Sequence, residues 1–523
     1  MPTRNRLAVL VFILAAVAAL PASAADCAGL AHANLTSTEI TSASTLPQGA
    51  FTPPIGEFIK HVTSFCRVTG VMKPTSDSYI RFEVWLPEAD WNGKYLGVGN
   101  GGFAGTIDYS SMANNVNNGY ATAASDTGHQ AESADATWAY HHPEKITDFG
   151  YRALHLTTVN AKALIKTFYN QPVAHSYFSS CSDGGREALI EAQRFPDDFD
   201  GILAGAPAND WTHLVSAGVA GAQALISPAG YISSLKLPAI HKAVLSACDA
   251  QDGVKDGVIN DPVRCHFNPS ELLCKGPEST TCLTQPQINA LNILYTGAKD
   301  SHGNPVFPGF MPGSENGWSQ WVVGFAPGGS LMSAFVENYF RYMVFDDAHW
   351  NVLTASIDES VRRANEKTAE ALNATNPDLK PFQSRCGKLI LYHGWNDPAI
   401  SPLNTIHYYQ EIQKTMTSSV ASQFVRLYMV PGMQHCGGGA GPNVFGQFGP
   451  AKDHDPTKNI YFALENWVEG NQPPAQITAT KYAGDSWAGK AVMTRPLCPY
   501  PEIAEYKGSG DTSNASSFTC AAQ

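Results

Sequence analysis

Five short apolar runs, each ending in a loop rich in glycine, proline or aspartate, place the strongest constraint on the fold of this chain. They cover residues 95–98, 175–179, 202–206, 389–392 and 425–430. Buried parallel strands have this pattern, because both of their faces are covered and their carboxyl ends run into loops. Helical segments at 151–169 and 186–195 separate consecutive runs. The sequence therefore predicts an α/β fold with a mostly parallel sheet and with its chemistry at the carboxyl ends of the strands.

The alternation of strands and helices breaks between residues 211 and 379. This segment carries four cysteines, many glycines and prolines, and an aromatic-rich stretch at 318–350. We interpret 211–379 as an inserted lid domain and assign the catalytic domain to 25–210 and 380–523. Most of the aromatic side chains should pack in the core of the lid, and one to three of them should face a substrate.

The first residues of the chain indicate export. Arg4 and Arg6 precede an apolar run at 7–20, and small residues at 22–24 form a cleavage pattern. Residues 1–24 are therefore predicted to be a removed signal peptide. The apolar run is shorter than the roughly 20 residues that cross a bilayer, so we expect no membrane anchor. A secreted or periplasmic location follows.

Eleven cysteines in an exported chain favour disulfides, because oxidising compartments preserve them. We expect five disulfides and one free thiol. Close spacing favours three pairs, which are Cys248 with Cys265, Cys274 with Cys282, and Cys498 with Cys520. Cys27 and Cys66 are also expected in disulfides, whereas the state of Cys386 stays open.

The charge of the chain argues against certain classes of binding partner. Its formal net charge is −12, and no run of the sequence is dense in lysine and arginine. Nucleic acids and anionic membranes bind through clustered cations, so neither is an expected partner. A small neutral or modestly polar substrate fits the composition better.

Three residues at the ends of predicted strands have the chemistry of a hydrolytic site. Ser182 lies on a strand-to-helix turn, where Gly184 and Gly185 permit the tight backbone of a nucleophile elbow, although Ser180 replaces the glycine usual two residues earlier. Asp397 and His435 each follow a later apolar run. Singly, each of the three could be an ordinary loop residue. Together, in the order serine, aspartate, histidine, they predict the nucleophile, orienting acid and base of an α/β-hydrolase.

Such a site also needs donors for the oxyanion that develops in the reaction. The backbone N–H of Asp183, which follows the nucleophile, is one candidate. The second donor is expected from the loop at 99–102, where the choice between Gly101 and Gly102 stays open.

A second group of polar residues lies in the loop at 248–258. Carboxylates at Asp249, Asp252 and Asp256 follow one another at short spacing in a loop interrupted by glycine. Hard oxygen ligands at this spacing suit Ca²⁺, although the loop lacks the final glutamate of an EF-hand. The alternative is a polar loop clamped by Cys248 and Cys265.

Several motifs together resemble the tannase and feruloyl esterase family, which also includes the hydrolase of mono(2-hydroxyethyl) terephthalate. They are Cys-Ser-Asp at 181–183, Ala-Gly-Ala-Pro at 204–207, His-Gly-Trp-Asn-Asp-Pro at 393–398, His-Cys at 435–436 and Arg-Pro-Leu-Cys-Pro-Tyr-Pro at 495–501. The resemblance spans nearly the whole mature chain. It implies an α/β-hydrolase core with an inserted lid, and a disulfide between Cys181 and Cys436. It also implies a structural calcium ion in the lid, held by the side chains of Asp249, Asp252 and Asp256 and the backbone carbonyls of Val254 and Val258.

The resemblance further implies a substrate class. We expect a carboxylic ester hydrolase that acts through an acyl-enzyme on small esters of aromatic acids such as ferulate or gallate, free or attached to plant polysaccharide or polyphenol. A terephthalate monoester is the alternative substrate. A non-catalytic, calcium-stabilised carbohydrate-binding or scaffold protein is the alternative of a different class, and the complete set of Ser182, Asp397 and His435 argues against it.

Overall fold

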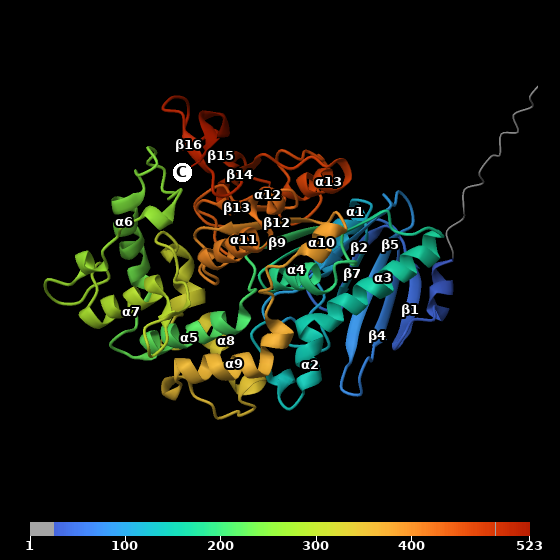
Figure 1. Ribbon diagram of the computed structural model, residues 1–523, viewed down its shortest axis with the longest axis horizontal. Helices are drawn as coiled ribbons and strands as arrows, with labels where there is room; N and C mark the ends of the chain where they lie inside the picture. Colours follow the sequence, from blue (N-terminus) through green and yellow to red (C-terminus); the bar gives the residue numbers. More distant parts are fainter. Residues whose placement is uncertain (1–25, 487, 523) are drawn as a thin grey trace, which may run out of the picture.

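A nine-stranded sheet forms the centre of the computed structural model, which describes residues 26–486 and 488–522 (Figure 1). The predicted signal peptide, residues 1–24, lies outside the described residues. The strand order is β1-β4-β5-β7-β6-β8-β9-β12-β13, and the six strands from β7 to β13 run parallel. Five of these six correspond to the predicted runs, namely β6 (Lys94–Val98), β8 (His175–Cys181), β9 (Gly201–Gly205), β12 (Lys388–Gly394) and β13 (Val425–Val430). The expected α/β fold with a mostly parallel sheet is confirmed.

The other edge of the sheet is antiparallel and was not predicted. It contains β1 (Thr38–Leu46), β4 (Phe65–Met72) and β5 (Ile80–Pro87), and β5 pairs antiparallel with β7 (Ala121–Ser125). Strand β1 is polar and largely exposed, and β7 consists of alanine, threonine and serine. Neither strand has the long apolar side chains that mark a buried strand in a sequence.

Helices cover both faces of the sheet, because alternate residues of a buried strand point to opposite sides. Leu389 and Leu391 of β12 pack in one core cluster with α3 (Ala153–Tyr169), α4 (Asp183–Arg194) and α11 (Pro402–Met416). Ile390 and Tyr392 pack on the other side with α13 (Ile460–Gly470). Both faces of the strand are therefore hydrophobic, as its continuous apolar sequence indicates.

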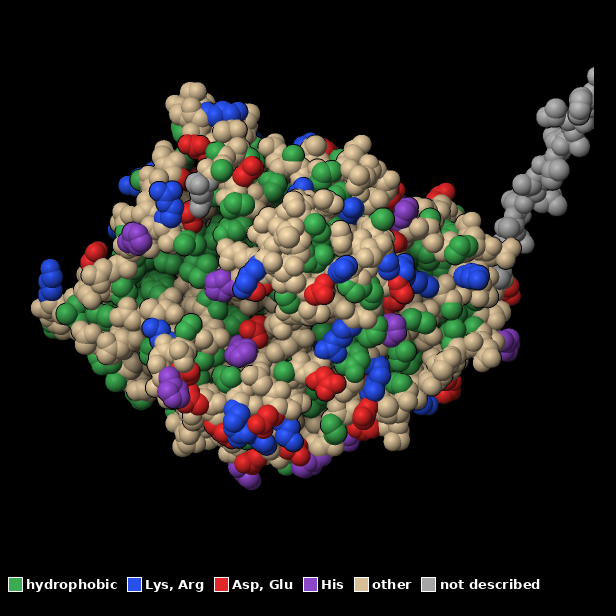
Figure 2. Space-filling model, in the orientation of Figure 1, with side chains coloured by type: hydrophobic (Ala, Val, Ile, Leu, Met, Phe, Trp, Pro, Cys, Tyr) green, Lys and Arg blue, Asp and Glu red, His purple; other side chains and the backbone are tan. Residues whose placement is uncertain are grey.

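The connection between β9 and β12 leaves the sheet and forms a helical region (Figure 1, green to yellow). Its main helices are α5 (Trp211–Ile226), α6 (Leu237–Cys248), α7 (Gln285–Thr296), α8 (Leu331–Asn338) and α9 (Ile357–Leu372). Residues of α5, α6 and α7 form a cluster of their own with the buried Trp318. Charged side chains gather over α9, whereas hydrophobic side chains gather in a hollow near α6 and α7 (Figure 2). The predicted lid, residues 211–379, covers these helices.

Five disulfides fasten loops to this framework. They join Cys27 to Cys66, Cys181 to Cys436, Cys248 to Cys265, Cys274 to Cys282, and Cys498 to Cys520, and Cys386 is an exposed free thiol. The three pairs favoured by close spacing are among them. None of the helices within residues 26–486 and 488–522 has the length and hydrophobicity that crossing a membrane requires.

Candidate active site

Ser182 occupies a sharp turn between β8 and α4. Its backbone has φ 69° and ψ −122°, a conformation that is costly for a residue with a side chain. Hydrogen bonds fix it there: the Ser182 N–H donates to the carbonyl of Gly205 at 2.9 Å, and the Ser182 carbonyl accepts from the N–H of Ala208 at 3.1 Å. The turn projects the serine side chain above the carboxyl end of the sheet, as in a nucleophile elbow.

Gly184 and Gly185 do not themselves form the tight backbone turn that the sequence predicted for them. Both are ordinary helical residues of α4, and the left-handed conformation belongs to Ser182 itself. A Cβ atom at Gly184 would lie 1.9 Å from the Ser180 hydroxyl oxygen, and one at Gly185 would lie 2.3 Å from the Gly205 carbonyl oxygen. The two glycines therefore let α4 pack directly against β8 and β9, with Ser180 filling the space in front of Gly184.

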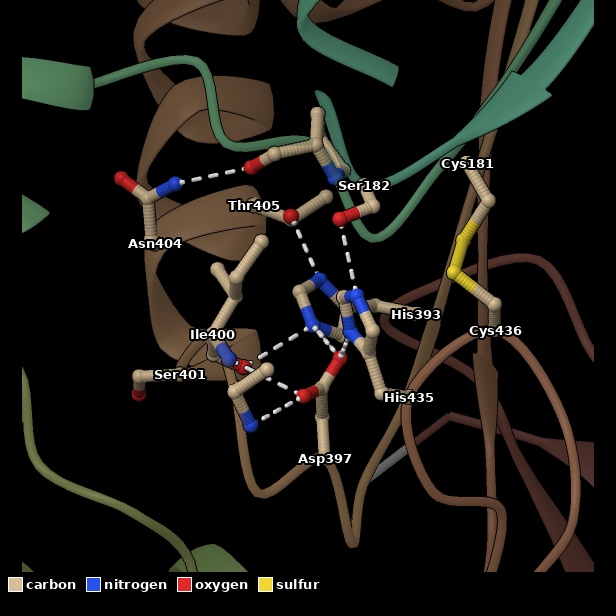
Figure 3. A network of polar contacts seen from close by, with 12 residues as sticks. Cys181, Ser182, His393, Asp397, Ile400, Ser401, Asn404, Thr405, His435 and Cys436 are labelled. Atoms are coloured by element: carbon tan, nitrogen blue, oxygen red, sulfur yellow. Dashed lines mark hydrogen bonds and ion pairs between the residues drawn. A yellow bond between two sulfur atoms is a disulfide. The ribbon is translucent and has the colours of Figure 1, made fainter. Parts of the chain in front are cut away.

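His435 and Asp397 complete a hydrogen-bonded chain with Ser182 (Figure 3). The Nε2 atom of His435 lies 2.8 Å from the Ser182 hydroxyl oxygen, and its Nδ1 atom lies 2.8 Å from Oδ2 of Asp397. Asp397 follows β12 and His435 follows β13, which is the neighbouring parallel strand. The shared direction of the strands thus brings together residues that are 253 positions apart in the chain.

Asp397 is fully buried and accepts four hydrogen bonds. Its Oδ1 accepts from the N–H groups of Ala399 at 2.7 Å and Ile400 at 2.9 Å, and its Oδ2 accepts from His435 and, at 3.1 Å, from Nε2 of His393. Burial alone would raise the pKa of Asp397, but the charge of His435 and the hydrogen bonds from both histidines hold it well below its ordinary value. The carboxylate is therefore ionised and oriented toward His435.

His393 is a part of this site that sequence reasoning missed. It lies in the 393–398 motif but received no role there. Because the Asp397 carboxylate can only accept, His393 carries its proton on Nε2, and its Nδ1 accepts from the hydroxyl of Thr405 at 2.7 Å. His393 is fully buried, so it holds the carboxylate without contact with the cavity.

A disulfide joins the residues adjacent to Ser182 and His435 (Figure 3). Cys181 precedes Ser182, Cys436 follows His435, and their Cα atoms are 6.0 Å apart. The bond therefore fixes the distance between the two loops that carry the serine and the histidine.

Removal of this disulfide is expected to lower activity as well as stability. In the double variant Cys181→Ala with Cys436→Ala, we expect kcat to fall at least about tenfold, because proton transfer depends on close placement of base and nucleophile. Loss of the loop constraint is also worth up to roughly 4 to 5 kcal/mol of folding free energy. Hydrolysis assayed well below the melting temperature separates the two effects.

The matched control is Cys498→Ala with Cys520→Ala, which removes a disulfide near the carboxyl terminus. It should lower the melting temperature with little change in kcat. If the Cys181–Cys436 variant behaves in the same way, that disulfide only stabilises the fold.

A cavity of about 600 Å³ opens at Ser182 and His435. Gly101, Gly102 and Asp183 also line it, so all three predicted oxyanion donors face the same cavity as Ser182. The N–H of Asp183 lies in the first turn of α4, where it has no helical carbonyl to bond. Gly102 has φ 61°, and a Cβ atom there would lie 2.4 Å from the Ser133 carbonyl oxygen, so this loop position requires glycine.

Lid residues make the cavity strongly apolar. From the aromatic stretch at 318–350, Trp321 and Phe335 line the cavity, and the Trp321 ring lies 5.1 Å from the His435 ring. Other aromatics of that stretch, including Trp318 and Phe340, are buried in the hydrophobic clusters. Among the described residues that line the cavity, none is lysine or arginine. The site therefore suits an apolar, uncharged group.

The predicted calcium loop lies between α6 and Cys265. Asp249 is buried, and its Oδ1 accepts from the N–H of Gly257 at 3.0 Å, while Asp252 accepts from its own loop. Arg495 donates to Oδ2 of Asp256 at 2.5 Å. Burial and the charge of Asp256 raise the pKa of Asp252 despite its hydrogen bond to the N–H of Val254. The loop thus holds three carboxyl groups, of which Asp256 pairs with Arg495, and this concentration of negative charge suits a bound divalent cation.

The arrangement of these carboxyl groups limits how a cation would be held. Among the described residues, they do not form a group whose ligand atoms all lie within 4.8 Å of one another. Calcium also takes backbone carbonyls, and Val254 and Val258 lie in the same loop. The donor set therefore fits calcium and does not resemble a compact transition-metal site.

Comparison with known proteins agrees with the fold and the site. The profile of a family described as tannase and feruloyl esterase matches residues 66–521. An uncharacterized esterase of Xanthomonas campestris pv. campestris is 43% identical over 548 residues, which cover 99% of this chain and 95% of the relative. A probable feruloyl esterase B-1 of Aspergillus oryzae is 32% identical over 511 residues, covering 94% of this chain and 92% of the relative. The crystal structure of feruloyl esterase B from Aspergillus oryzae superposes with a TM-score of 0.86 at 32% identity, covering 94% and 98% of the two chains.

The fold and these relatives define the protein as a carboxylic ester hydrolase with an α/β-hydrolase fold. The chain belongs to the tannase and feruloyl esterase family. The family resemblance inferred from the motifs is thereby confirmed.

Proposed function

We propose that the chain hydrolyses esters of aromatic acids by a serine mechanism with Ser182 as nucleophile. The observation that carries this proposal is the continuous hydrogen bonding from Ser182 through His435 to the ionised Asp397 at the wall of an apolar cavity. A serine hydroxyl is a weak nucleophile until a base can take its proton, and His435 lies at the distance that this transfer needs.

The reaction follows from the positions of these groups. The Ser182 oxygen attacks the ester carbonyl while Nε2 of His435 takes the hydroxyl proton, and Asp397 stabilises the imidazolium that forms. The N–H of Asp183 and one from Gly101 or Gly102 bind the oxyanion. His435 then gives the proton to the leaving alcohol, and the acyl group remains on Ser182. Water, deprotonated by His435, attacks this acyl-enzyme, releases the acid and restores the serine.

The cavity favours a neutral aromatic acyl group, as in ferulate. Trp321 and Phe335 offer ring surfaces near His435, and aliphatic side chains such as Leu214 and Met332 extend the apolar lining. A terephthalate monoester carries a carboxylate, and desolvating that charge without a lysine or arginine partner is costly. Nothing in the lining therefore favours the terephthalate alternative. Gallate presents three hydroxyl groups to the same apolar walls and is expected to bind less well than ferulate.

A panel of small methyl esters tests this assignment. Dimethyl and monomethyl terephthalate are nearly the same size and differ by one charge, so their comparison isolates the effect of the missing cation. We expect kcat/KM to be at least about tenfold higher for the dimethyl ester, a difference of about 1.4 kcal/mol in transition-state binding. Methyl ferulate should exceed methyl gallate. Preference for the monomethyl ester would contradict the substrate assignment, and hydrolysis of none of the four would support the non-catalytic alternative.

We also propose that the loop at 248–258 binds a structural calcium ion. Asp249, Asp252 and Asp256 with the carbonyls of Val254 and Val258 would hold it, and the ion would supply charge compensation in the lid. Arg495 of β15 (Ala491–Leu497) links this loop to the carboxyl-terminal part of the chain, so the ion would also stabilise that contact.

Calcium removal is expected to lower thermal stability more than activity. A bound ion stabilises the folded state by mass action and takes no part in acyl transfer. Chelation should therefore lower the melting temperature, with kcat at mild temperature nearly unchanged, and added Ca²⁺ but not Mg²⁺ should reverse the shift. Metal analysis that finds no calcium, together with an unchanged melting curve after chelation, would remove this site from the account.

We also propose that the chain is exported. Five disulfides are typical of proteins that fold in an oxidising compartment. The signal-like sequence at residues 1–24 supports the same location.

A further inference from the structure

A compact group of metal-binding residue types lies beneath the sheet, at the far end of α4 from Ser182. His155 comes from α3, Glu191 from the last turn of α4, and Asp198 from the loop that leads to β9. One ligand atom from each lies within 4.8 Å of the other two. The Nδ1 atom of His155 is 2.6 Å from Oδ2 of Asp198. Three separate segments of the hydrolase core thus converge on one point.

Among the residues that the structure describes, no N–H or O–H group donates to Glu191, although its carboxyl group lies within hydrogen-bond range of the Asp198 carboxyl. Its side chain is fully buried, and neither carboxyl oxygen accepts from a donor within the described residues. The buried hydroxyls of Tyr95 and Thr158 interact with each other, and the charges of Asp198 and Glu191 act on the Tyr95 hydroxyl. A buried carboxyl group that no donor reaches is rare in protein interiors and indicates a bound water or ion at this point.

The geometry points to a binding site for a divalent transition-metal ion, formed by His155, Glu191 and Asp198. One imidazole nitrogen and two carboxylate oxygens from separate segments are a common set of zinc ligands, with water in the fourth position. The ion would bond the carboxyl group of Glu191 and replace the hydrogen bond between His155 and Asp198. This site is distinct from the calcium loop, which offers only oxygen ligands.

The groups that surround the three proposed ligands are compatible with a bound metal ion. The Lys162 ammonium donates to the backbone carbonyls of Asp197 and Asp198, and its charge acts on the carboxyl groups of Asp198 and Glu191 without a direct ion pair to either. The His155 ring stacks on Phe195 at a centroid distance of 3.9 Å, which fixes its orientation. Burial, followed by the charge of Asp198, raises the pKa of Glu191 well above its ordinary value.

The ion would act on stability rather than on the reaction. Glu191 lies nine positions beyond Ser182 on the helix that the nucleophile begins, which corresponds to about 13 Å along the axis. A metal bond at that point would tie α4 to α3 and to the loop before β9. It would hold the helix that supports the nucleophile turn and have no contact with substrate.

Cobalt binding to the full-length, calcium-loaded protein tests the inference, because Co²⁺ in a tetrahedral zinc site absorbs visible light. We expect one equivalent of Co²⁺ to give this absorption in the wild-type protein, and Zn²⁺ to displace it and raise the melting temperature. Glu191→Gln and His155→Gln should each weaken Co²⁺ binding at least about tenfold. The control is His141→Gln, because His141 pairs with Asp346 at 2.5 Å on the surface without a third ligand, and it should bind Co²⁺ like the wild type.

Equal Co²⁺ binding by the wild type and both site variants would overturn the inference. The inference would also fail if Zn²⁺ left the melting temperature of the wild-type protein unchanged while the Glu191→Gln substitution raised the melting temperature. Glu191 would then be a buried acid that shares a proton with Asp198. If Glu191→Gln does not fold, His155→Gln decides the question, because His155 is only partly buried. Ester hydrolysis is not the readout, so the result is independent of the proposed serine mechanism.

Discussion

Ser182→Ala is expected to fold and to lower kcat by about 10⁴-fold or more, because it removes the atom that forms the acyl bond. The backbone hydrogen bonds that hold the turn do not involve the side chain, so the turn itself should persist. Hydrolysis of methyl ferulate by the purified variant measures its activity, and thermal melting measures whether it is folded.

A matched control addresses the strained backbone at this position. Ser37 also has a left-handed conformation, with φ 53°, and lies on an exposed turn far from the cavity. Ser37→Ala should therefore show the cost of alanine at a positive φ while activity stays intact. Turnover by Ser182→Ala within tenfold of the wild type would rule out Ser182 as the nucleophile.

Asp397→Asn is expected to have the second largest effect, with a fall in kcat of about 10⁴-fold. The carboxylate accepts from both histidines at Oδ2 and from two backbone N–H groups at Oδ1, whereas an amide would place a donor against one of these two pairs of N–H groups. The imidazole of His435 would lose the tautomer that accepts the serine proton, and the imidazolium would lose its counter-charge. Because Asp397 is fully buried, the melting temperature should fall as well.

Asp346→Asn is the control for this variant, since Asp346 pairs with His141 on the surface. It should leave kcat nearly unchanged. If Asp346 or its neighbour Asp347 proved essential while Asp397→Asn kept full activity, the acid of the triad would have been misassigned.

The sequence predicted the parallel half of the sheet well and the antiparallel half poorly. Strand β13 was predicted to the residue, because Val425–Val430 is largely buried on both faces and is apolar apart from Arg426. Strand β1 was missed because it lies at the edge of the sheet, where exposed threonines and serines replace the apolar run. The apolar pattern therefore detects buried strands with long apolar side chains, and it also misses β7, which is buried but consists of alanine, threonine and serine.

The residues of the site also differed in how well they could be predicted from the sequence. Ser182, Asp397 and His435 were expected to lie together, and the structure brings them together, because each lies in a loop that follows a recognisable strand and parallel strands end at one edge of the sheet. His393 could not, because its role depends on the direction in which a buried side chain points. The group of His155, Glu191 and Asp198 was also missed, since its members belong to two helices and a loop and have no spacing that marks a metal site.

Covalent labelling with a fluorophosphonate, followed by peptide mapping, tests the central claim most directly. This reagent reacts with a serine hydroxyl that a neighbouring base activates. We expect one label per chain, on Ser182, slower labelling in the presence of methyl ferulate, and none in Ser182→Ala. An enzyme that hydrolyses methyl ferulate while Ser182 stays unlabelled, or that carries the label on another residue, would contradict the account.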